Sequence, residues 1–334
     1  MKFLKPLLLI FSFCVLQLQA QILPTFGDSR TGGTGMQFLK IATDARSTAM
    51  GGAFVAIAND VSSLYWNPAG ITGIDTGKVN FQLSYAKYFG DISGNFAGAV
   101  IKSGKYSFVG FNVFAMNYGK MDETTENDPK GTGRTFSPIQ YSVGITYAKI
   151  LTNSFSFGIT GKFAQEGYAG VTVNNAMFDL GLKYDVGIKH TRFGVSFSNF
   201  GFNVAPSGTV SILKFNGQQT INNFSEISVP VFFRLGVAFD PIHNDKHILT
   251  IAGQLNHPTD NNETYAFGAE YSYLKIGYLR TGYEFFADES NVLPSFGAGL
   301  KILRNFGGFT IDYGILTKSR LGNLQRITLG INIR

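Results

Sequence analysis

The sequence has little cysteine, tryptophan or charge. Cys14 is the only cysteine and Trp66 the only tryptophan among 334 residues, and charged residues make up 15% of the chain. Cys14 lies in an amino-terminal segment that we expect to be removed after export. The mature chain would then have no disulfide, no cysteine-ligated metal and no thiol nucleophile.

Long apolar runs are also missing after residue 20. A helical membrane protein would show runs of about 18 or more apolar residues. The chain nevertheless contains 32 Phe, 15 Tyr and 40 Gly, and its mean hydropathy is close to zero. Its apolar residues are spread at every second position, which is how a transmembrane β-barrel distributes its hydrophobicity.

No charge of one sign dominates any part of the chain. The 28 Lys and Arg residues outnumber the 22 Asp and Glu residues by six, and they are dispersed. Because clusters of five or six basic residues are missing, we expect no nucleic-acid partner.

The first twenty residues have the layout of a secretory signal. Lys2 and Lys5 precede an apolar run from Leu7 to Leu18, and we expect cleavage between Ala20 and Gln21. A membrane anchor is the competing reading, but a spanning helix needs about 20 apolar residues. Removing the signal would lower the net charge from +6 to +4, because two lysines and no acid are lost.

From residue 78 onward the chain reads as one amphipathic strand after another. Apolar side chains at Ile327, Leu329, Ile331 and Ile333 alternate with Arg326, Thr328, Gly330, Asn332 and Arg334. Side chains of a strand point to opposite faces in turn, so each segment would have one apolar face and one polar face. A soluble antiparallel sandwich shows the same local pattern, so the loops must decide between the two.

Loop lengths favour a membrane barrel. We expect fourteen strands, beginning near residues 78, 94, 105, 136, 154, 177, 192, 230, 247, 263, 275, 294, 308 and 324. The connections at 103–104, 151–153, 189–191, 241–246, 274–275 and 305–307 are short. Those at 119–135, 168–175, 201–230, 257–262 and 286–293 are mostly longer. An even strand number and alternating short and long loops are typical of bacterial outer-membrane barrels. We therefore predict an all-β fold, a transmembrane antiparallel β-barrel of about 14 strands.

Two residue types have expected places in such a barrel. Glycines on the polar face would leave lumen space or allow a bend: Gly158, Gly181, Gly236, Gly268, Gly299 and Gly330. Aromatic residues near strand ends would suit the interfacial girdles: Tyr85, Tyr88, Phe89, Phe200, Phe285 and Phe286.

Residues 21–77 show short helical pieces instead of alternation. Asp44 could cap a helix that ends at Gly51-Gly52, and Pro68 could begin another after Asn67. About fifty residues suffice for a plug inside a barrel. The expected organisation is a signal peptide (1–20), a plug or cap segment (21–77) and a transmembrane barrel (78–334).

Within this segment the sequence resembles a known family. The motifs are Phe38-Leu39-Lys40-Ile41, Asp44-Ala45-Arg46, Met50-Gly51-Gly52-Ala53-Phe54-Val55-Ala56 and Leu64-Tyr65-Trp66-Asn67-Pro68-Ala69-Gly70. They resemble the amino-terminal signature of the PorV/PorQ family, which is itself similar to the FadL-type fatty-acid channels with their fourteen-stranded barrel.

The resemblance implies an outer-membrane component of the type IX protein secretion system of Bacteroidota. Its expected partners are outer-membrane lipid and either secretion-system subunits or cargo signal domains, with a lipid or detergent molecule as an occupant of the lumen. The alternative is a FadL-like channel for hydrophobic small molecules.

Five residues of the signature are our candidate contacts for a partner or for the plug: Asp44, Arg46, Asn67, Pro68 and Ala69. Capping and turn formation are the commoner uses of such residues. The expected lumen face carries charges of both signs, which argues against an ion-selective ring: Lys162, Glu166, Asp179, Lys183, Asp185, Arg234, Asp240, Glu270, Lys301, Asp312 and Arg326. Pairs among them could hold the plug through Arg46.

We expect no enzymatic activity, no cofactor and no metal. His243 and His247 are four residues apart, but Pro241 and the strand that follows argue against a helical metal pair. The acidic residues Asp122, Glu123, Glu126 and Asp128 lack the glycine and closing glutamate of a hand-type Ca²⁺ site. His257 near Asp260 is the only candidate for hydrolytic chemistry, and a surface enzyme is our third alternative.

Overall fold

The computed structural model describes residues 33–74, 77–125, 128–214, 217–285, 293–304, 307–318 and 322–333. The expected signal peptide and its cleavage site lie outside these residues. In the described part, no helix is long and apolar enough to span a membrane.

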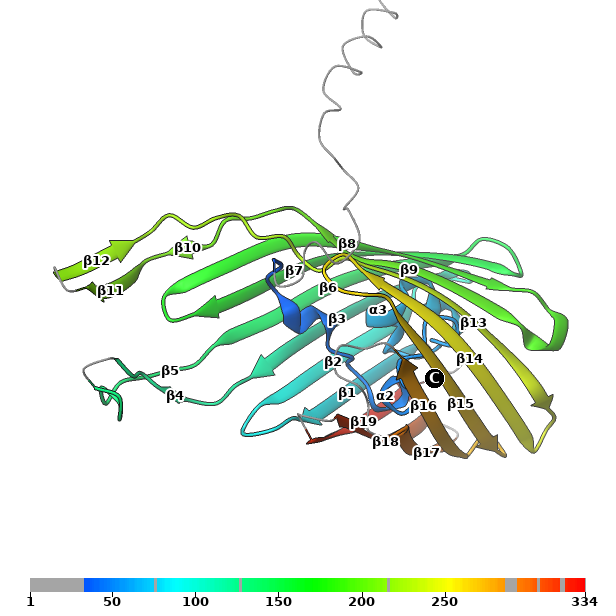
Figure 1. Cartoon of the computed structure of the whole chain (residues 1–334). Coiled ribbons are helices and arrows are strands. Elements are labelled where there is room, and N and C mark those ends of the chain that lie inside the picture. The colour runs from blue at the N-terminus through cyan, green and yellow to red at the C-terminus, as the bar shows by residue number, and fades with distance from the viewer. Residues whose placement is uncertain are drawn as a thin grey trace, which may run out of the picture.

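Fourteen antiparallel strands close into a barrel (Figure 1). They are β1 (Val79–Lys87), β2 (Ser93–Lys102), β3 (Ser107–Asn117), β6 (Ile139–Ile150), β7 (Phe155–Tyr168), β8 (Val171–Asp185), β9 (Arg192–Gly201), β13 (Phe232–His243), β14 (His247–Pro258), β15 (Thr264–Tyr273), β16 (Gly277–Phe285), β17 (Ser295–Arg304), β18 (Gly307–Lys318) and β19 (Gly322–Ile333). The first strand pairs with the last, Val79 opposite Ile333. All fourteen predicted strands are present, and the predicted fold class is confirmed.

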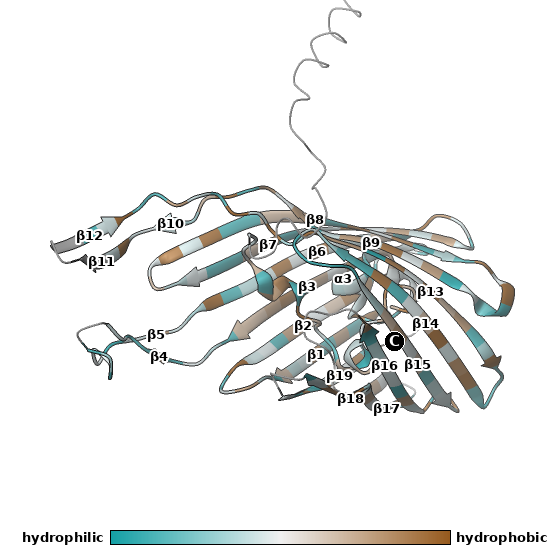
Figure 2. Ribbon diagram, in the orientation of Figure 1, coloured by the Kyte–Doolittle hydropathy of each residue, from teal (hydrophilic) through white to brown (hydrophobic). Residues whose placement is uncertain are grey.

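The expected period of two is visible along the strands (Figure 2). In β1, Phe81, Leu83 and Tyr85 are exposed on the outside, whereas Asn80 and Gln82 are buried inside. The same holds in β19, where Ile327, Leu329, Ile331 and Ile333 are all exposed. A closed sheet leaves no backbone edge in the hydrocarbon, so this arrangement can cross a bilayer.

Long and short connections lie at opposite ends of the barrel, as predicted. The hairpins β4–β5 (Met121–Asp122, Thr135–Phe136) and β11–β12 (Val210–Lys214, Gly217–Ile221) project from one end (Figure 1). We call this the outer end, because long loops of bacterial barrels face the exterior. The inner end carries the short turns, including η4 (Ile188–His190).

One predicted loop was wrong. Residues 168–175 do not form a long loop but a tight hairpin between β7 and β8, with Ala169 and Gly170 at φ 43° and 90°. Both residues have the positive φ that a two-residue hairpin turn requires. β8 begins at Val171, six residues earlier than the strand expected near residue 177.

The aromatic residues are only partly where we expected them. Tyr85 and Phe285 are exposed on the outside, whereas Phe89 is exposed at the mouth of a cavity at the same end as Tyr88. Tyr88 instead turns inward, and its hydroxyl accepts a hydrogen bond from Arg326 at 2.9 Å. Phe200 packs against Phe178, with 4.7 Å between ring centroids, and Phe286 lies outside the described residues.

The amino-terminal segment folds inside the barrel (Figure 1). It contains η2 (Gln37–Lys40), α2 (Ala45–Ala49), α3 (Ser63–Trp66) and η3 (Pro68–Gly73). Its apolar residues form about half of the buried core, and inward-facing residues of the wall such as Phe96, Phe108 and Phe114 form the rest. We call residues 33–74 the plug.

Candidate functional site: a plugged lumen with two chambers

Inward-facing glycines of the wall make room for the plug. A Cβ added at Gly158 or Gly181 would overlap the backbone of Pro68 and Ala69. Added Cβ atoms at Gly194 and Gly236 would meet Val55, and at Gly268 and Gly282 they would meet Met50. At these glycines the plug packs directly against the sheet, whereas Gly299 and Gly330 face the wall side chains of Asp312, Arg280 and Thr310.

Asn67, Pro68 and Ala69 lie where the plug touches β7 and β8. The Asn67 side chain accepts a hydrogen bond from the Ala69 amide at 3.1 Å and so caps η3. Its Nδ2 donates to the carbonyls of Val55 at 3.1 Å and of Leu182, in the barrel wall, at 3.0 Å. One side chain thus shapes a turn and ties the plug to the wall.

Asp44 lies at the start of α2, as the sequence suggested. Its carboxylate accepts hydrogen bonds from the Ser47 amide at 2.7 Å and from the Trp66 indole at 3.0 Å. The first bond satisfies a free amide at the helix start. The second joins α2 to α3, so Asp44 acts within the plug.

Arg46 is part of a chain of alternating charges that crosses from the plug to the wall. Its guanidinium contacts Asp60 at 2.9 Å and both carboxylate oxygens of Glu270, at 2.8 and 2.9 Å. Glu270 also binds Arg280 at 2.6 Å, and Arg280 binds Asp312 at 2.6 Å. Sequence reasoning missed Asp60 and Arg280. The parity of β16 could have revealed Arg280, which shares its face with Gly282.

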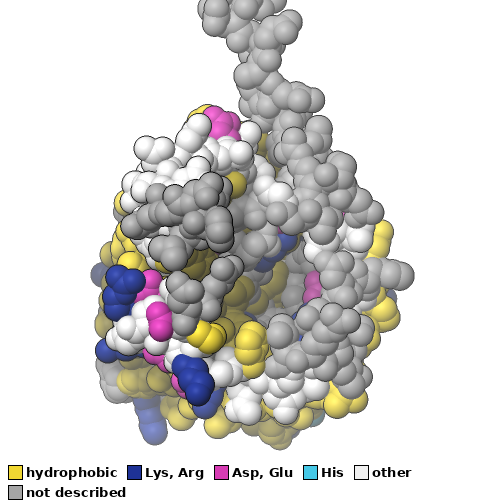
Figure 3. All heavy atoms as spheres, turned by 60° about the vertical axis from the view of Figure 1, so that its left-hand side comes forward, with side chains coloured by type: hydrophobic (Ala, Val, Ile, Leu, Met, Phe, Trp, Pro, Cys, Tyr) yellow, Lys and Arg dark blue, Asp and Glu magenta, His cyan; other side chains and the backbone are white. Residues whose placement is uncertain are grey.

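The plug separates two chambers. The outer chamber has a volume of about 420 Å³. Its lining surface is mainly apolar and includes Tyr65, Trp66, Tyr88 and Phe232, together with the charged residues Arg234, Glu284 and Arg326. Figure 3 looks onto the outer end and shows a hollow with hydrophobic side chains in it. The inner chamber, of about 390 Å³, is lined mainly by charged and polar residues, including Arg46, Asp240, Glu270 and Asp312.

The outer chamber buries a guanidinium among aromatic rings. Arg234 is 3% exposed and lies over the rings of Tyr65, Trp66 and Phe232, at 5.4, 5.2 and 4.5 Å. It donates to the Ser198 hydroxyl at 3.0 Å. Among the described residues no carboxylate lies within ion-pair distance of it. Cation–π contacts stabilise such a charge only in part.

The first plug residues are fixed to the outer end. Lys40 and Gln37 both reach Asp260, at 2.7 and 2.8 Å, and Thr34 also donates to it. Burial raises the pKa of Asp260, but the hydrogen bonds from Gln37, Lys40 and Thr34 outweigh burial and lower it below the usual range.

The residues considered for other chemistry are engaged elsewhere. His257 contacts Glu263 at 2.9 Å, whereas Asp260 holds the plug. In the long loop, Glu123 pairs with Arg134 at 2.6 Å, and Glu126 lies outside the described residues. Five of the eleven expected lumen charges form ion pairs: Lys162 pairs with Asp179 at 2.7 Å, and Asp240, Glu270 and Asp312 pair with arginines.

A closed fourteen-stranded barrel with an oily exterior and an internal plug defines an outer-membrane transport-type barrel of Gram-negative bacteria. The family model described as "Type IX secretion system protein PorV" matches residues 25–261. The chain therefore belongs to the PorV family. Comparison with curated proteins finds no match.

Solved structures with the same fold are FadL-type barrels. The toluene transporter TbuX of Ralstonia pickettii is 15% identical, with a TM-score of 0.57 over 86% of this chain and 96% of that one. The toluene transporter TodX of P. putida is 13% identical (TM-score 0.55; 86% and 96%). A FadL homologue of Pseudomonas aeruginosa is 12% identical (TM-score 0.52; 87% and 98%). The family and these neighbours are secretion and transport barrels.

Proposed function

We propose that this protein works in a type IX secretion apparatus of a Bacteroidota-like bacterium. It binds secretion-system subunits or the signal domains of exported cargo at its outer end, by contact and not by chemistry. The observation that carries the proposal is the family match over residues 25–261. The architecture of the outer end supports it.

The outer end offers backbone edges to a protein partner. Strands β7 and β8 contain 14 and 15 residues, more than the roughly 9–11 that cross a bilayer. Their outer ends are themselves paired, since β6 pairs with β7 up to Gly167 and β10 (Ser207–Gly208) pairs with Val171 and Thr172 of β8. The hairpin β11–β12 is a separate two-stranded sheet that pairs with no third strand among the described residues. Open strand edges can accept a strand from another chain through main-chain hydrogen bonds. This favours a partner that adds a strand.

The five signature residues act, in this proposal, by keeping the plug in place. Asn67, Pro68 and Ala69 lie against β7 and β8, and Arg46 binds Glu270. Asp44 holds α2 to α3. A plug seated in this way would keep a protein partner at the rim instead of letting it pass through the lumen.

A pull-down from the native host tests the proposal. The tagged full-length protein should recover secretion-system subunits or cargo signal domains. A variant with residues 210–221 replaced by a short Gly-Ser linker should recover much less, whereas exchanging the inner turn at 244–246 for Gly-Asn-Gly should change nothing. Recovery of neither partner by the unaltered protein would remove the specific role.

The outer chamber favours a second candidate function, the binding of a hydrophobic small molecule as in a FadL-like channel. Its volume of about 420 Å³ lies within the range of small-molecule pockets. Its aromatic lining suits an apolar body, and the buried Arg234 suits an anionic group.

Native mass spectrometry separates the two functions. A small-molecule channel should retain a lipid or other hydrophobic ligand after mild detergent extraction, and Trp66→Ala should release it. His190→Ala provides the control, because His190 lies in η4 at the opposite, inner end of the barrel. A protein carrier need not retain such a ligand, and absence of any retained ligand would remove the support for the channel function.

A further inference from the structure

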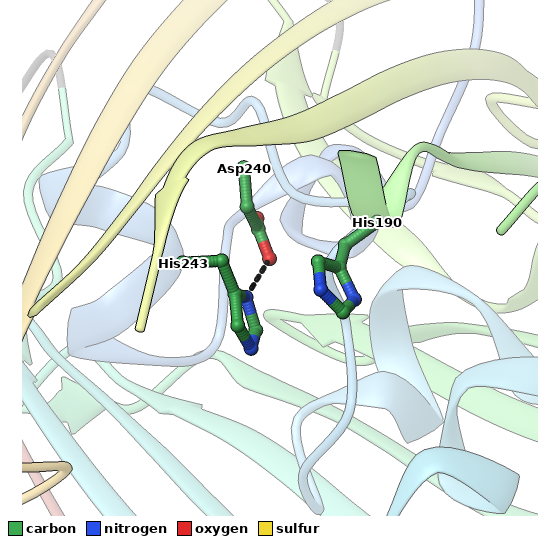
Figure 4. Close-up of side chains that lie close together, drawn as sticks. All are labelled: His190, Asp240 and His243. Atoms are coloured by element: carbon green, nitrogen blue, oxygen red, sulfur yellow. Dashed lines mark hydrogen bonds and ion pairs between the residues drawn. The ribbon is translucent and has the colours of Figure 1, made fainter. Parts of the chain in front are cut away.

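Three potential metal ligands meet at the inner end of the barrel. They are His190, the last residue of η4, and Asp240 and His243 near the end of β13. One ligand atom from each lies within 4.8 Å of the other two. The imidazole rings stack with 3.7 Å between centroids, and the Asp240 carboxylate lies above the gap between them (Figure 4).

A β-bulge brings two of the three residues together. Residues three positions apart in a regular strand point to opposite faces. In β13 the register with β14 shifts between Phe239 and Ile242, so Asp240 and His243 point to the same side. Their side chains form a 3.0 Å hydrogen bond between Oδ2 and Nδ1. Bulges commonly re-aim side chains in this way.

The turn before β9 supplies the third residue in an uncommon backbone conformation. Lys189 and His190 have φ angles of 47° and 53°, and Gly187, two residues before Lys189, has a φ of 83°. A left-handed conformation is uncommon for residues other than glycine, and in this chain Leu274 and Lys275 adopt it in another turn. This conformation is what carries the His190 ring over to His243, a contact between positions 53 residues apart in the sequence.

Hydrogen bonds from neighbouring side chains fix the position of the Asp240 carboxylate. Asp240 Oδ1 accepts hydrogen bonds from Arg192 at 2.6 Å and from Thr250 at 2.8 Å. Asp240 is 4% exposed, whereas both histidines are exposed at the mouth of the inner chamber. The carboxylate is therefore fixed by hydrogen bonds to its Oδ1, and the imidazoles can rotate towards a ligand.

We propose that His190, Asp240 and His243 form a binding site for a divalent transition-metal ion such as Zn²⁺ at the inner rim. Two imidazoles and one carboxylate suit zinc better than Ca²⁺ or Mg²⁺, which prefer oxygen ligands. Tetrahedral bonds of roughly 2.0–2.1 Å require the ligand atoms to approach to about 3.4 Å. Rotation of the two exposed rings supplies this movement. The fourth position opens to the inner chamber.

Bound metal would clamp the β8–β9 turn to β13. The turn and the strand come from neighbouring parts of the barrel wall, since β9 pairs with β13 through Arg192 opposite Ala238. A metal bridge would add a link at the inner rim that the hydrogen-bonded ladder does not provide. Metal that binds only the folded state also stabilises that state.

Zinc titration of the full chain in detergent tests the site. The protein carries a tag without histidine, is first treated with a chelator, and is titrated with Zn²⁺ by calorimetry at neutral pH. The unaltered protein should bind one ion, and His190→Ala and His243→Ala should each weaken binding by more than about tenfold. His257→Ala, at the outer end beside Glu263, should bind as the unaltered protein does.

A second measurement keeps the result interpretable. Heat-modifiable migration in gels reports whether each variant forms a barrel, and His190→Gln serves as a milder change in an exposed turn. The proposal is overturned if the folded unaltered protein shows no saturable binding. It is equally overturned if the folded His190 and His243 variants bind Zn²⁺ as tightly as the unaltered protein.

Discussion

The two chambers of the lumen differ in how their buried charges are satisfied. In the inner chamber Arg46 and Arg280 alternate with carboxylates at 2.6–2.9 Å. In the outer chamber Arg234 lies among aromatic rings, and no carboxylate of the described residues pairs with it. Buried charges are costly unless paired. The arginines of the inner chamber are thus paired within the protein and hold the plug. Arg234, with no such partner in the described part of the chain, suits the outer chamber to an anionic ligand.

Breaking the inner charge chain should have the largest effect. Arg46→Ala removes the partner of Glu270 and Asp60, and we expect a loss of about 3 kcal/mol in the free energy of plug seating, because breaking a buried ion pair strands its partner. Hydrogen exchange of residues 45–58 measures it. Arg134→Ala, which breaks the exposed pair with Glu123, should change nothing measurable. Equal effects of the two variants would show that the charge chain does not hold the plug.

Adding a methyl group at an inward-facing glycine that packs against the plug should have the next largest effect. Gly158→Ala places a methyl group against the Pro68 backbone, and we expect a loss of about 1–3 kcal/mol from overpacking. Gly161→Ala in the same strand is the matched control, since nothing lies within 4 Å of its added Cβ. The same exchange experiment compares the two, and unchanged protection in Gly158→Ala would contradict the close packing of plug and wall.

The outer chamber can be tested through its unusual arginine. Arg234→Leu keeps an apolar side chain but removes the charge, so binding of an anionic amphiphile such as a fatty acid should fall by roughly tenfold, as for the loss of one charge-assisted hydrogen bond. Fluorescence competition in detergent measures it. A fatty acid that binds both proteins equally would show that Arg234 plays no part in recognition.

The smallest effect concerns pH and the attachment of the first plug residues. Because the pKa of Asp260 is lowered in the folded protein, its contribution to stability is fully present above the ordinary aspartate pKa of about 3.9. That contribution is lost as the pH falls through the lowered value. We therefore expect residues 33–41 to exchange faster at pH 3 than at pH 6, after correction for the intrinsic exchange rates. Asp260→Asn should largely remove this difference, and an unchanged pH dependence would assign it to another group.

Much of the barrel could be predicted because its signals are local. Alternation of side chains determines which face of each strand meets lipid, and loop lengths distinguish the outer end of the barrel from the inner end. Asp44, Asn67 and Pro68 were placed correctly at helix starts, because capping depends on residues only two or three positions apart. The loop expected at 168–175 was wrong, since the pairing of β7 with β8 continues to Tyr168 and Val171.

The candidate site was harder to predict, because its residues come from distant parts of the chain. The sequence put Arg46 forward and named Glu270 only as one of eleven lumen charges, since nothing along the chain singles out a partner 224 positions away. It also pointed to His243 with His247, whereas the structure places His243 against His190. Neither the Arg46–Glu270 contact nor the His190–His243 contact corresponds to a spacing that could be recognised in the sequence.

The sequence by itself determined the strands, their lipid-facing sides, the loop asymmetry and the helical nature of the plug. These features follow from the period of the backbone and from contacts between near neighbours. Only the tertiary structure decided that the lumen glycines meet plug backbone, that the plug divides the lumen, and that two histidines share a carboxylate. Such features depend on closure of the barrel, which brings residues together through strand order and register instead of through distance along the chain.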